Sequence, residues 1–247
     1  AAVKLIDEGN TIPFIARYRK EATGSLNDEV LRALGERLAY LRGLEERKEQ
    51  VIGSIREQEK LTPELERQIR EAGTLVAVED LYRPYKPKRR TRAMIAREKG
   101  LEPLADIIIL QMTRQPLEKE AEAFVAPEKG VESAGEAVAG AMDILAERIS
   151  DNAQYRTYIR SATWNQGILA SQAKDEGEKS VYEMYYQYTE PVKKAAGHRI
   201  LALNRGEKEK FLTVKIEAPG DEIIGWLERK GIRSDNPYTA PVLKETV

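Results

Sequence analysis

The sequence contains no cysteine and a single histidine, His198. Without cysteine the chain forms no disulfide, no zinc–thiolate site and no thiol nucleophile. The lone histidine has no companion of the kind that a metal centre or a catalytic pair requires. No group of acidic residues has the spacing of a metal-binding loop either. We therefore expect neither a metal ion nor another cofactor.

The motifs of common catalytic sites are also missing. The sequence has no glycine-rich phosphate loop, no nucleophile elbow and no metalloprotease helix. Glu79 and Asp80 are adjacent, so on a helix their side chains point in different directions and make a poor acid–base pair. These absences predict a protein that is not an enzyme and takes no small-molecule substrate.

Long apolar runs are absent as well. No run approaches the length of a membrane span, and the opening AAVKLIDEGN lacks the apolar region of a secretion signal. The chain does not begin with methionine, which suggests a fragment or the ordered part of a longer protein. Together with the lack of cysteine, these features are typical of a cytoplasmic protein without a membrane partner.

The composition that remains is that of a helical protein. Charged residues make up 33% of the 247 residues and hydrophobic residues 41%, which allows a solvated surface around a core. Aromatic residues contribute only 6%, and Leu, Ala, Glu, Lys and Arg are abundant. This balance argues against disorder and predicts a mainly α fold in one large or two small domains.

Helix signals recur through residues 1–166. The stretch Ser25-Leu-Asn-Asp28 resembles a capping box and opens a long amphipathic helix that runs to about Lys60. Thr62-Pro63 and Thr91 are typical helix starts. Other helices are expected over residues 1–9, 74–82, 101–111, 116–125, 133–150 and 152–166.

The pattern changes after Gly167. Residues 199–219 resemble a helix or turn followed by a strand pair, with residues 204–210 as the connecting turn and a small β element near residues 200–217. Apolar and polar residues alternate over 212–217, as in a half-buried strand. We expect the tail, residues 233–247, to be a loop, and the tyrosines of the stretch YEMYYQYTEP to pack in the core. Three regions follow: helical residues 1–73, central helical residues 74–166 and mixed α/β residues 167–247.

The positive charge is concentrated in one segment. Residues 81–100 hold eight Lys and Arg against one acidic residue, although the whole chain has a net charge of -1. Pro84 and Pro87 disfavour helix there, so residues 81–93 are expected to form an extended connector between two helices. Extended cations can follow a polyanion, with Arg suited to bidentate phosphate contacts. The candidate phosphate-binding residues are Arg83, Lys86, Lys88, Arg89, Arg90 and Arg92.

A second reading of this segment stays open. Its cations could pair with acidic side chains of the chain itself, including Glu79 and Asp80, and its Arg and Tyr side chains could join neighbouring helices. Tyr82 and Tyr85 could stack on bases or pack inward. On this reading the connector is structural.

A smaller basic group lies in the stretch PFIARYRKEATG. Phe14 and Tyr18 are four residues apart and share a helical face, whereas Arg17, Arg19 and Lys20 project elsewhere. A helix, Thr23-Gly24 and a further helix are compatible with a helix-turn-helix that binds nucleic acid. The alternative is that Arg17 and Arg19 pair with acidic side chains of the neighbouring helices.

Three long strings, TIPFIARYRKEATGSL, EDLYRPYKPKRRTRAMIAREKGLEPLA and HRILALNRGEKE, resemble the Tex family of bacterial transcription accessory proteins. The resemblance runs from about residue 2 to the C-terminus. It implies a cytosolic, mostly helical, multidomain nucleic-acid-binding protein. The family has an N-terminal helix-turn-helix-like region, a resolvase-like domain with a ribonuclease H fold, helix-hairpin-helix modules and an OB-fold RNA-binding domain. We expect residues 167–247 to lead towards the resolvase-like domain, which this chain lacks, as it lacks the OB fold.

The resemblance favours a non-catalytic role in transcription. The chain would supply non-specific backbone contacts to RNA or DNA and organise neighbouring domains, with the transcription machinery as a further partner. The alternative is a scaffold or protein-interaction module that binds no nucleic acid and docks on other domains or on the transcription machinery.

Overall fold

The computed structural model describes all residues, 1–247, and the chain is mainly α-helical with one small antiparallel sheet, as predicted. The chain divides into two compact units, residues 1–85 and residues 86–247. The boundary falls inside the predicted connector. None of the helices combines the length and the apolar character that a membrane span needs.

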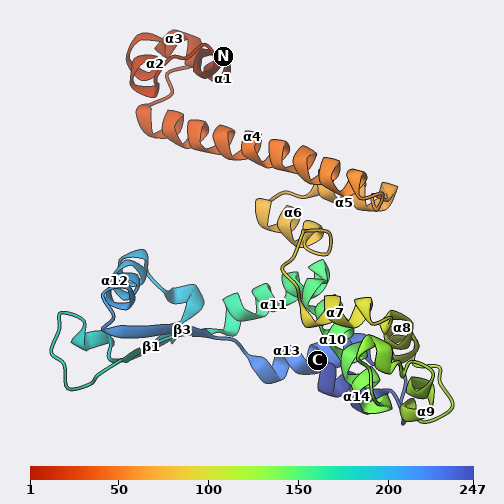
Figure 1. Ribbon diagram of the computed structural model, residues 1–247. Helices are drawn as coiled ribbons and strands as arrows, with labels where there is room; N and C mark the ends of the chain where they lie inside the picture. The colour runs from red at the N-terminus through yellow and green to blue at the C-terminus, as the bar shows by residue number, and fades with distance from the viewer. The chain divides into compact units, whose positions relative to one another are not determined.

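The first unit is built on one long helix, α4 (Figure 1). Short helices α1 to α3 gather near its beginning, and α5 and α6 pack near its end. Its core consists of the inward-facing residues of α4, α5 and α6, among them Ile52, Ile55 and Ile69. The helices of this unit are α1 (Ala2–Asp7), α2 (Ile12–Tyr18), α3 (Lys20–Thr23), α4 (Asp28–Glu57), α5 (Pro63–Glu71) and α6 (Leu75–Tyr82).

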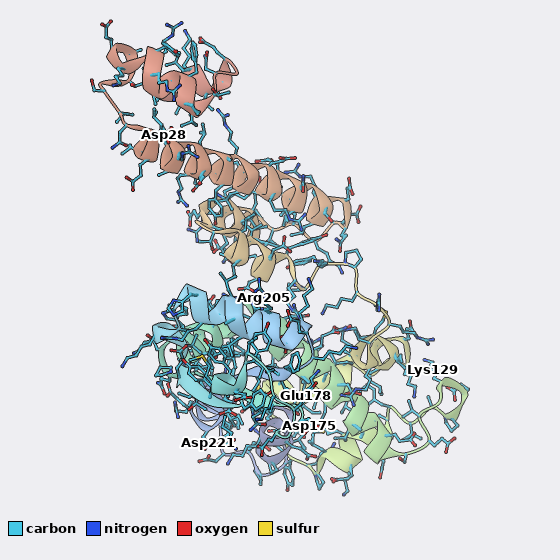
Figure 2. The ribbon with its side chains drawn as sticks, turned by 90° about the vertical axis from the view of Figure 1, so that its left-hand side faces the viewer. Asp28, Lys129, Asp175, Glu178, Arg205 and Asp221 are labelled. Atoms are coloured by element: carbon cyan, nitrogen blue, oxygen red, sulfur yellow. The ribbon has the colours of Figure 1, made fainter.

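The start of α4 corrects the predicted capping box. Asn27 is the N-cap, because its side chain accepts a hydrogen bond from the amide of Val30 at 2.9 Å. Asp28, at the beginning of the helix in Figure 2, instead pairs with Arg32 at 2.7 Å. Ser25 has a left-handed backbone with φ of 64° and does not cap the helix. The predicted starts at Thr62 and Thr91 are confirmed, since both hydroxyls accept the expected amide.

The second unit places α10 among shorter helices. Helices α7, α8, α9 and α14 pack around it, and its buried side chains include Ala137, Ala141, Ile144 and Leu145. The helices of this unit are α7 (Arg92–Glu98), α8 (Glu102–Leu110), α9 (Leu117–Glu122), α10 (Ala134–Asp151), α11 (Ala153–Gln166), α12 (Gly197–Lys208), α13 (Gly220–Gly231) and α14 (Ala240–Thr246). Short 3-10 turns lie at η1 (Pro127–Lys129), η2 (Glu183–Tyr185) and η3 (Val192–Lys194).

The sheet has three antiparallel strands in the order β2-β1-β3. The strands are β1 (Ile168–Ala173), β2 (Gln187–Pro191) and β3 (Leu212–Glu217). Leu169 of β1 lies opposite Ile216 of β3 and opposite Glu190 of β2. Helix α12 packs against β3.

Three predictions about the C-terminal third need correction. The strand at 212–217 is confirmed, but its partner is β1, which the sequence pattern did not reveal, and not a strand just before it. Residues 204–208 continue α12, so they are not the connecting turn. The tail is not a loop, because α14 forms there and buries Leu243 in the core around α10. The core position of Tyr182 and Tyr185 is confirmed.

Candidate nucleic-acid interface

The basic segment, residues 81–93, is extended over less of its length than predicted, because α6 continues to Tyr82 and α7 begins at Arg92. Between these helices, residues 83–85 form turns, residue 86 is a bend and residues 87–91 are irregular. Thr91 ends the non-helical stretch, because its hydroxyl accepts a hydrogen bond from the amide of Met94 at 3.1 Å and so caps α7. Arg83 belongs to the first compact unit and the other five candidate cations to the second.

Lys88 is held by acidic side chains of α10. Its ammonium group donates a hydrogen bond to Asp151 and lies 3.5 Å from a carboxylate oxygen of Glu147. All three side chains are largely buried, at 22% exposed for Lys88, 10% for Asp151 and 16% for Glu147. Asp151 is the last residue of α10, so the cation also complements the negative end of the helix dipole.

Glu147 is the centre of this cluster. It accepts hydrogen bonds from Thr91 at 2.9 Å and from Arg97 at 2.8 Å. Burial opposes ionisation of Glu147, but the bonds from Arg97 and Thr91 and the charges of Lys88 and Arg97 outweigh it. The pKa of Glu147 is therefore lowered below its ordinary value, and the carboxylate is charged at neutral pH.

The other cations of the segment reach the solvent. Arg89 is exposed and the structure gives it no ion pair or hydrogen bond. Arg90 pairs with Glu98 at 3.2 Å and Arg92 with Asp143 at 3.4 Å, yet their side chains remain 71% and 86% exposed. Exposed pairs of this kind contribute little to stability, at about 0 to 1 kcal/mol, so either arginine can leave its partner for a phosphate at small cost. Arg83 and Lys86 are also exposed.

The two tyrosines of the segment, Tyr82 and Tyr85, pack against the core of the first unit. Tyr82 is 8% exposed and its hydroxyl lies 3.0 Å from the hydroxyl of Ser54. Tyr85 is partly buried against the same core, and its carbonyl accepts a hydrogen bond from Gln58 at 3.1 Å. The inward packing that was one of two alternatives for these rings is therefore observed.

The second basic group is exposed on α2 and α3. Arg17, Arg19 and Lys20 all face solvent, and none forms an ion pair with an acidic side chain. The rings of Phe14 and Tyr18 lie 5.3 Å apart, as their spacing predicted, and the guanidinium of Arg19 lies 5.3 Å from the centre of the Phe14 ring. Tyr18 is 65% exposed, so this surface combines cations with an accessible aromatic ring.

The sequence did not reveal the acidic partners of Lys88. Glu147 and Asp151 are four residues apart on α10, a spacing that puts them on one helical face but is common on solvated helices. Asp151 lies 63 residues from Lys88 along the chain, and only the packing of α10 brings them together.

The fold and these contacts define a mainly helical protein with a basic segment in which one lysine is paired with buried carboxylates and several arginines are exposed. Two family models match the chain: the Tex-like protein N-terminal domain over residues 1–56 and the Tex central region-like domain over residues 112–232. The chain belongs to the Tex family.

Named relatives agree with this assignment. The chain is 46% identical over its whole length to the "Uncharacterized protein YdcI" of Bacillus subtilis, of which it spans 35%. Over 90% of its length it is 45% identical to the "Transcriptional accessory protein Tex" of Neisseria gonorrhoeae, of which it spans 29%. A more distant human relative, "S1 RNA-binding domain-containing protein 1", is 28% identical over 91% of the chain, which spans 23% of it. The chain thus spans about a third or less of the length of these relatives.

Proposed function

We propose that this chain contributes sequence-independent contacts to nucleic-acid phosphates within a cytoplasmic transcription accessory protein of the Tex family. The observation that carries the proposal is that the cations of the basic segment lie in two different environments. Lys88 is tied to α10, whereas Arg89, Arg90 and Arg92 extend into solvent from the same short stretch. The names of two relatives, which refer to transcription and to RNA binding, support nucleic acid as the polyanion.

The mechanism is charge neutralisation. Each cation that meets a phosphate releases condensed counterions, so affinity falls as salt rises. Arg89, Arg90, Arg92, Arg83 and Lys86 would make such contacts, and base identity would matter little because the contacts are to the backbone. Lys88 instead holds the segment in place.

The exposed group on α2 and α3 is a second contact surface of the same kind. Arg17, Arg19 and Lys20 have no acidic partner in the chain, and Tyr18 offers a ring for base stacking. Stacking of this kind contributes about 1 to 3 kcal/mol per base in single-stranded nucleic acid. Single strands should therefore bind this surface better than duplexes do.

The test is a salt series with labelled single-stranded RNA and duplex DNA, read by fluorescence anisotropy. The double variant Arg89→Glu/Arg90→Glu is compared with Arg114→Glu/Lys119→Glu, which makes the same change in net charge at exposed positions near α9. We expect the first variant to lose affinity for every sequence and to reduce the slope of log K against log salt by about one to two. Equal losses in both variants would mean that only net charge matters. If the wild type binds neither RNA nor DNA, the alternative of a scaffold or protein-interaction module is favoured instead.

A further inference from the structure

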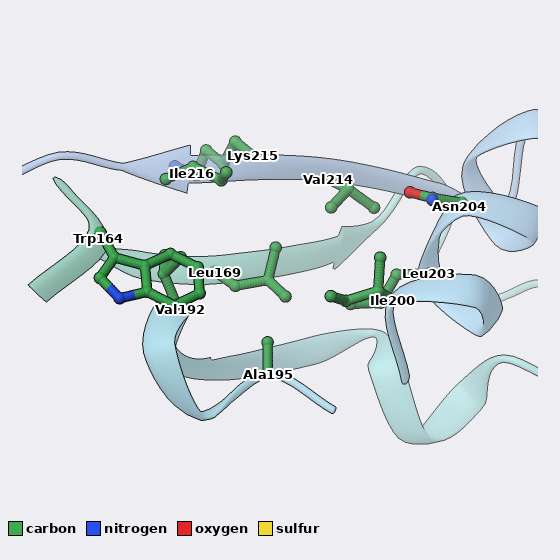
Figure 3. A pocket seen from close by; sticks show the side chains of 10 residues that line it. All are labelled: Trp164, Leu169, Val192, Ala195, Ile200, Leu203, Asn204, Val214, Lys215 and Ile216. Carbon is green, nitrogen blue, oxygen red and sulfur yellow. The ribbon is translucent and has the colours of Figure 1, made fainter. Parts of the chain in front are cut away.

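An open apolar groove lies on the sheet of the second unit, away from the basic segment in the sequence. It has a volume of about 340 Å³ and runs between α12, η3 and one face of the sheet (Figure 3). Eight of the ten residues that line it are apolar. The lining residues are Trp164, Leu169, Val192, Ala195, Ile200, Leu203, Asn204, Val214, Lys215 and Ile216.

The groove exists because α12 covers only part of β3. Leu212, Val214 and Ile216 alternate along the strand and share one face. Leu212 is fully buried, Val214 is partly buried and Ile216 is 57% exposed. Trp164 at the end of α11 is 58% exposed beside the same surface. Large apolar side chains gathered around one groove are typical of an interaction surface.

The edge of the groove is cationic. Lys193 and Lys194 lie in η3 between the lining residues Val192 and Ala195, and both are exposed without an ion pair. The two acidic residues of the sheet strands are already paired with cations. Glu190 pairs with Arg199 at 2.7 Å, and Glu217 pairs with Lys215 at 2.7 Å. A partner with acidic residues beside its apolar ones therefore complements this surface.

The geometry also favours one shape of partner. Strand addition along the outer edge of β3 is hindered, because the amide of Val214 already donates to the Glu207 side chain of α12 at 3.4 Å. A trough between a helix and a sheet instead accepts the apolar stripe of an amphipathic helix, whose side chains recur at three- and four-residue steps.

We propose that this groove binds an amphipathic helix of a partner protein that carries apolar residues on one face and glutamates or aspartates beside them. Ile216, Trp164 and Ile200 would contact the apolar face, and Lys193 and Lys194 would contact the acidic residues. This role is independent of phosphate binding by the basic segment.

The probe is a labelled synthetic helix with a leucine stripe flanked by glutamates, titrated with the 247-residue chain and read by fluorescence anisotropy. Its comparisons are a scrambled peptide of the same composition and a peptide with lysine in place of every glutamate. Ile216→Asp tests the groove, and Ile224→Asp is its control, because Ile224 is also exposed, at 45%, but lies on α13 outside the lining. Circular dichroism confirms that each variant is folded.

We expect the acidic helix to bind the wild type and the control, and Ile216→Asp to weaken it at least about tenfold, as for a central interface residue. Lys193→Glu/Lys194→Glu should weaken it as well. The proposal is overturned if the acidic helix binds no better than the scrambled or lysine peptide. It is also overturned if Ile216→Asp lowers the affinity for single-stranded RNA and not for the acidic helix. A third overturning result is that Ile216→Asp converts a dimer of the chain to a monomer, because the groove would then be occupied by a second copy of the chain.

Discussion

Lys88 and Asp151 form an ion pair across 63 residues of sequence, and the pair fastens the basic segment to the end of α10. Glu147, one helical turn earlier, adds a second carboxylate to the same ammonium group. Without Lys88, two largely buried carboxylates would lie close together on α10 with less positive charge to offset them. The position of the most basic segment of the chain is therefore set by two acidic side chains of α10.

Lys88→Met should destabilise the second unit, and Arg89→Met should not. Loss of a charged hydrogen bond with a largely buried partner costs about 2 kcal/mol, whereas changes at exposed, unpaired side chains usually stay within about 0.5 kcal/mol. Urea unfolding followed by circular dichroism measures both. Equal stabilities of the two variants would show that the Lys88 cluster does not hold the segment.

The lowered pKa of Glu147 predicts a pH dependence of stability. Because the pKa of this group is lower in the folded chain than its ordinary value of 4.5, the unfolded state binds the proton more readily. The stabilisation is complete above about pH 5 and is lost as pH falls through the folded pKa. Glu147→Gln should be less stable than the wild type at neutral pH, and the difference should shrink on acidification. A constant difference across urea titrations in that range would contradict this assignment.

Local rules explain what was predictable from the sequence. Thr62 and Thr91 cap their helices as expected, because the bond joins a side chain to an amide three residues away. The strand at 212–217 was visible because alternation is a property of adjacent residues. The capping box at Ser25 failed for a related reason: Asn27 offers a competing cap two residues later, and the left-handed backbone at Ser25 leaves that role to it.

What the sequence did not reveal is long-range. Strand β1 is short and polar at one end, and it becomes a central strand only because β2 and β3 pair with it from both sides. The acidic partners of Lys88 are likewise set by the packing of α10. Leu243 was assigned to a loop, yet it is 3% exposed and packs in the core around α10. The sequence showed that the candidate cations form a cluster. It did not show that Lys88 is paired with buried carboxylates whereas the arginines are exposed.

Two glycines in helices should respond in opposite ways to alanine. A Cβ at Gly140 of α10 would lie 2.4 Å from the Cδ1 atom of Leu101, which is itself 1% exposed, so Gly140→Ala should cost about 1 to 3 kcal/mol through overpacking. Gly43 of α4 has nothing within 4 Å of its Cβ position, and Gly43→Ala should stabilise by about 0.5 to 1 kcal/mol through helix propensity. Thermal unfolding of both variants tests this, and stabilisation by both would show that Leu101 can move aside.

Gln111 should control the order of the segment that leads to α14. It is 7% exposed in a left-handed conformation with φ of 56°, and its side chain donates to the carbonyl of Gly231 at 2.7 Å and accepts from the amide of Arg233 at 2.9 Å. Gln111→Ala leaves these backbone groups without partners, at a cost of about 1 to 3 kcal/mol, and the Arg233 amide should exchange faster with deuterium. Gln111→Gly relaxes the left-handed backbone but also removes the side chain, so it should speed exchange too. Gln115→Ala, at an exposed position nearby, is the control, and unchanged exchange at Arg233 in both Gln111 variants would rule out this role.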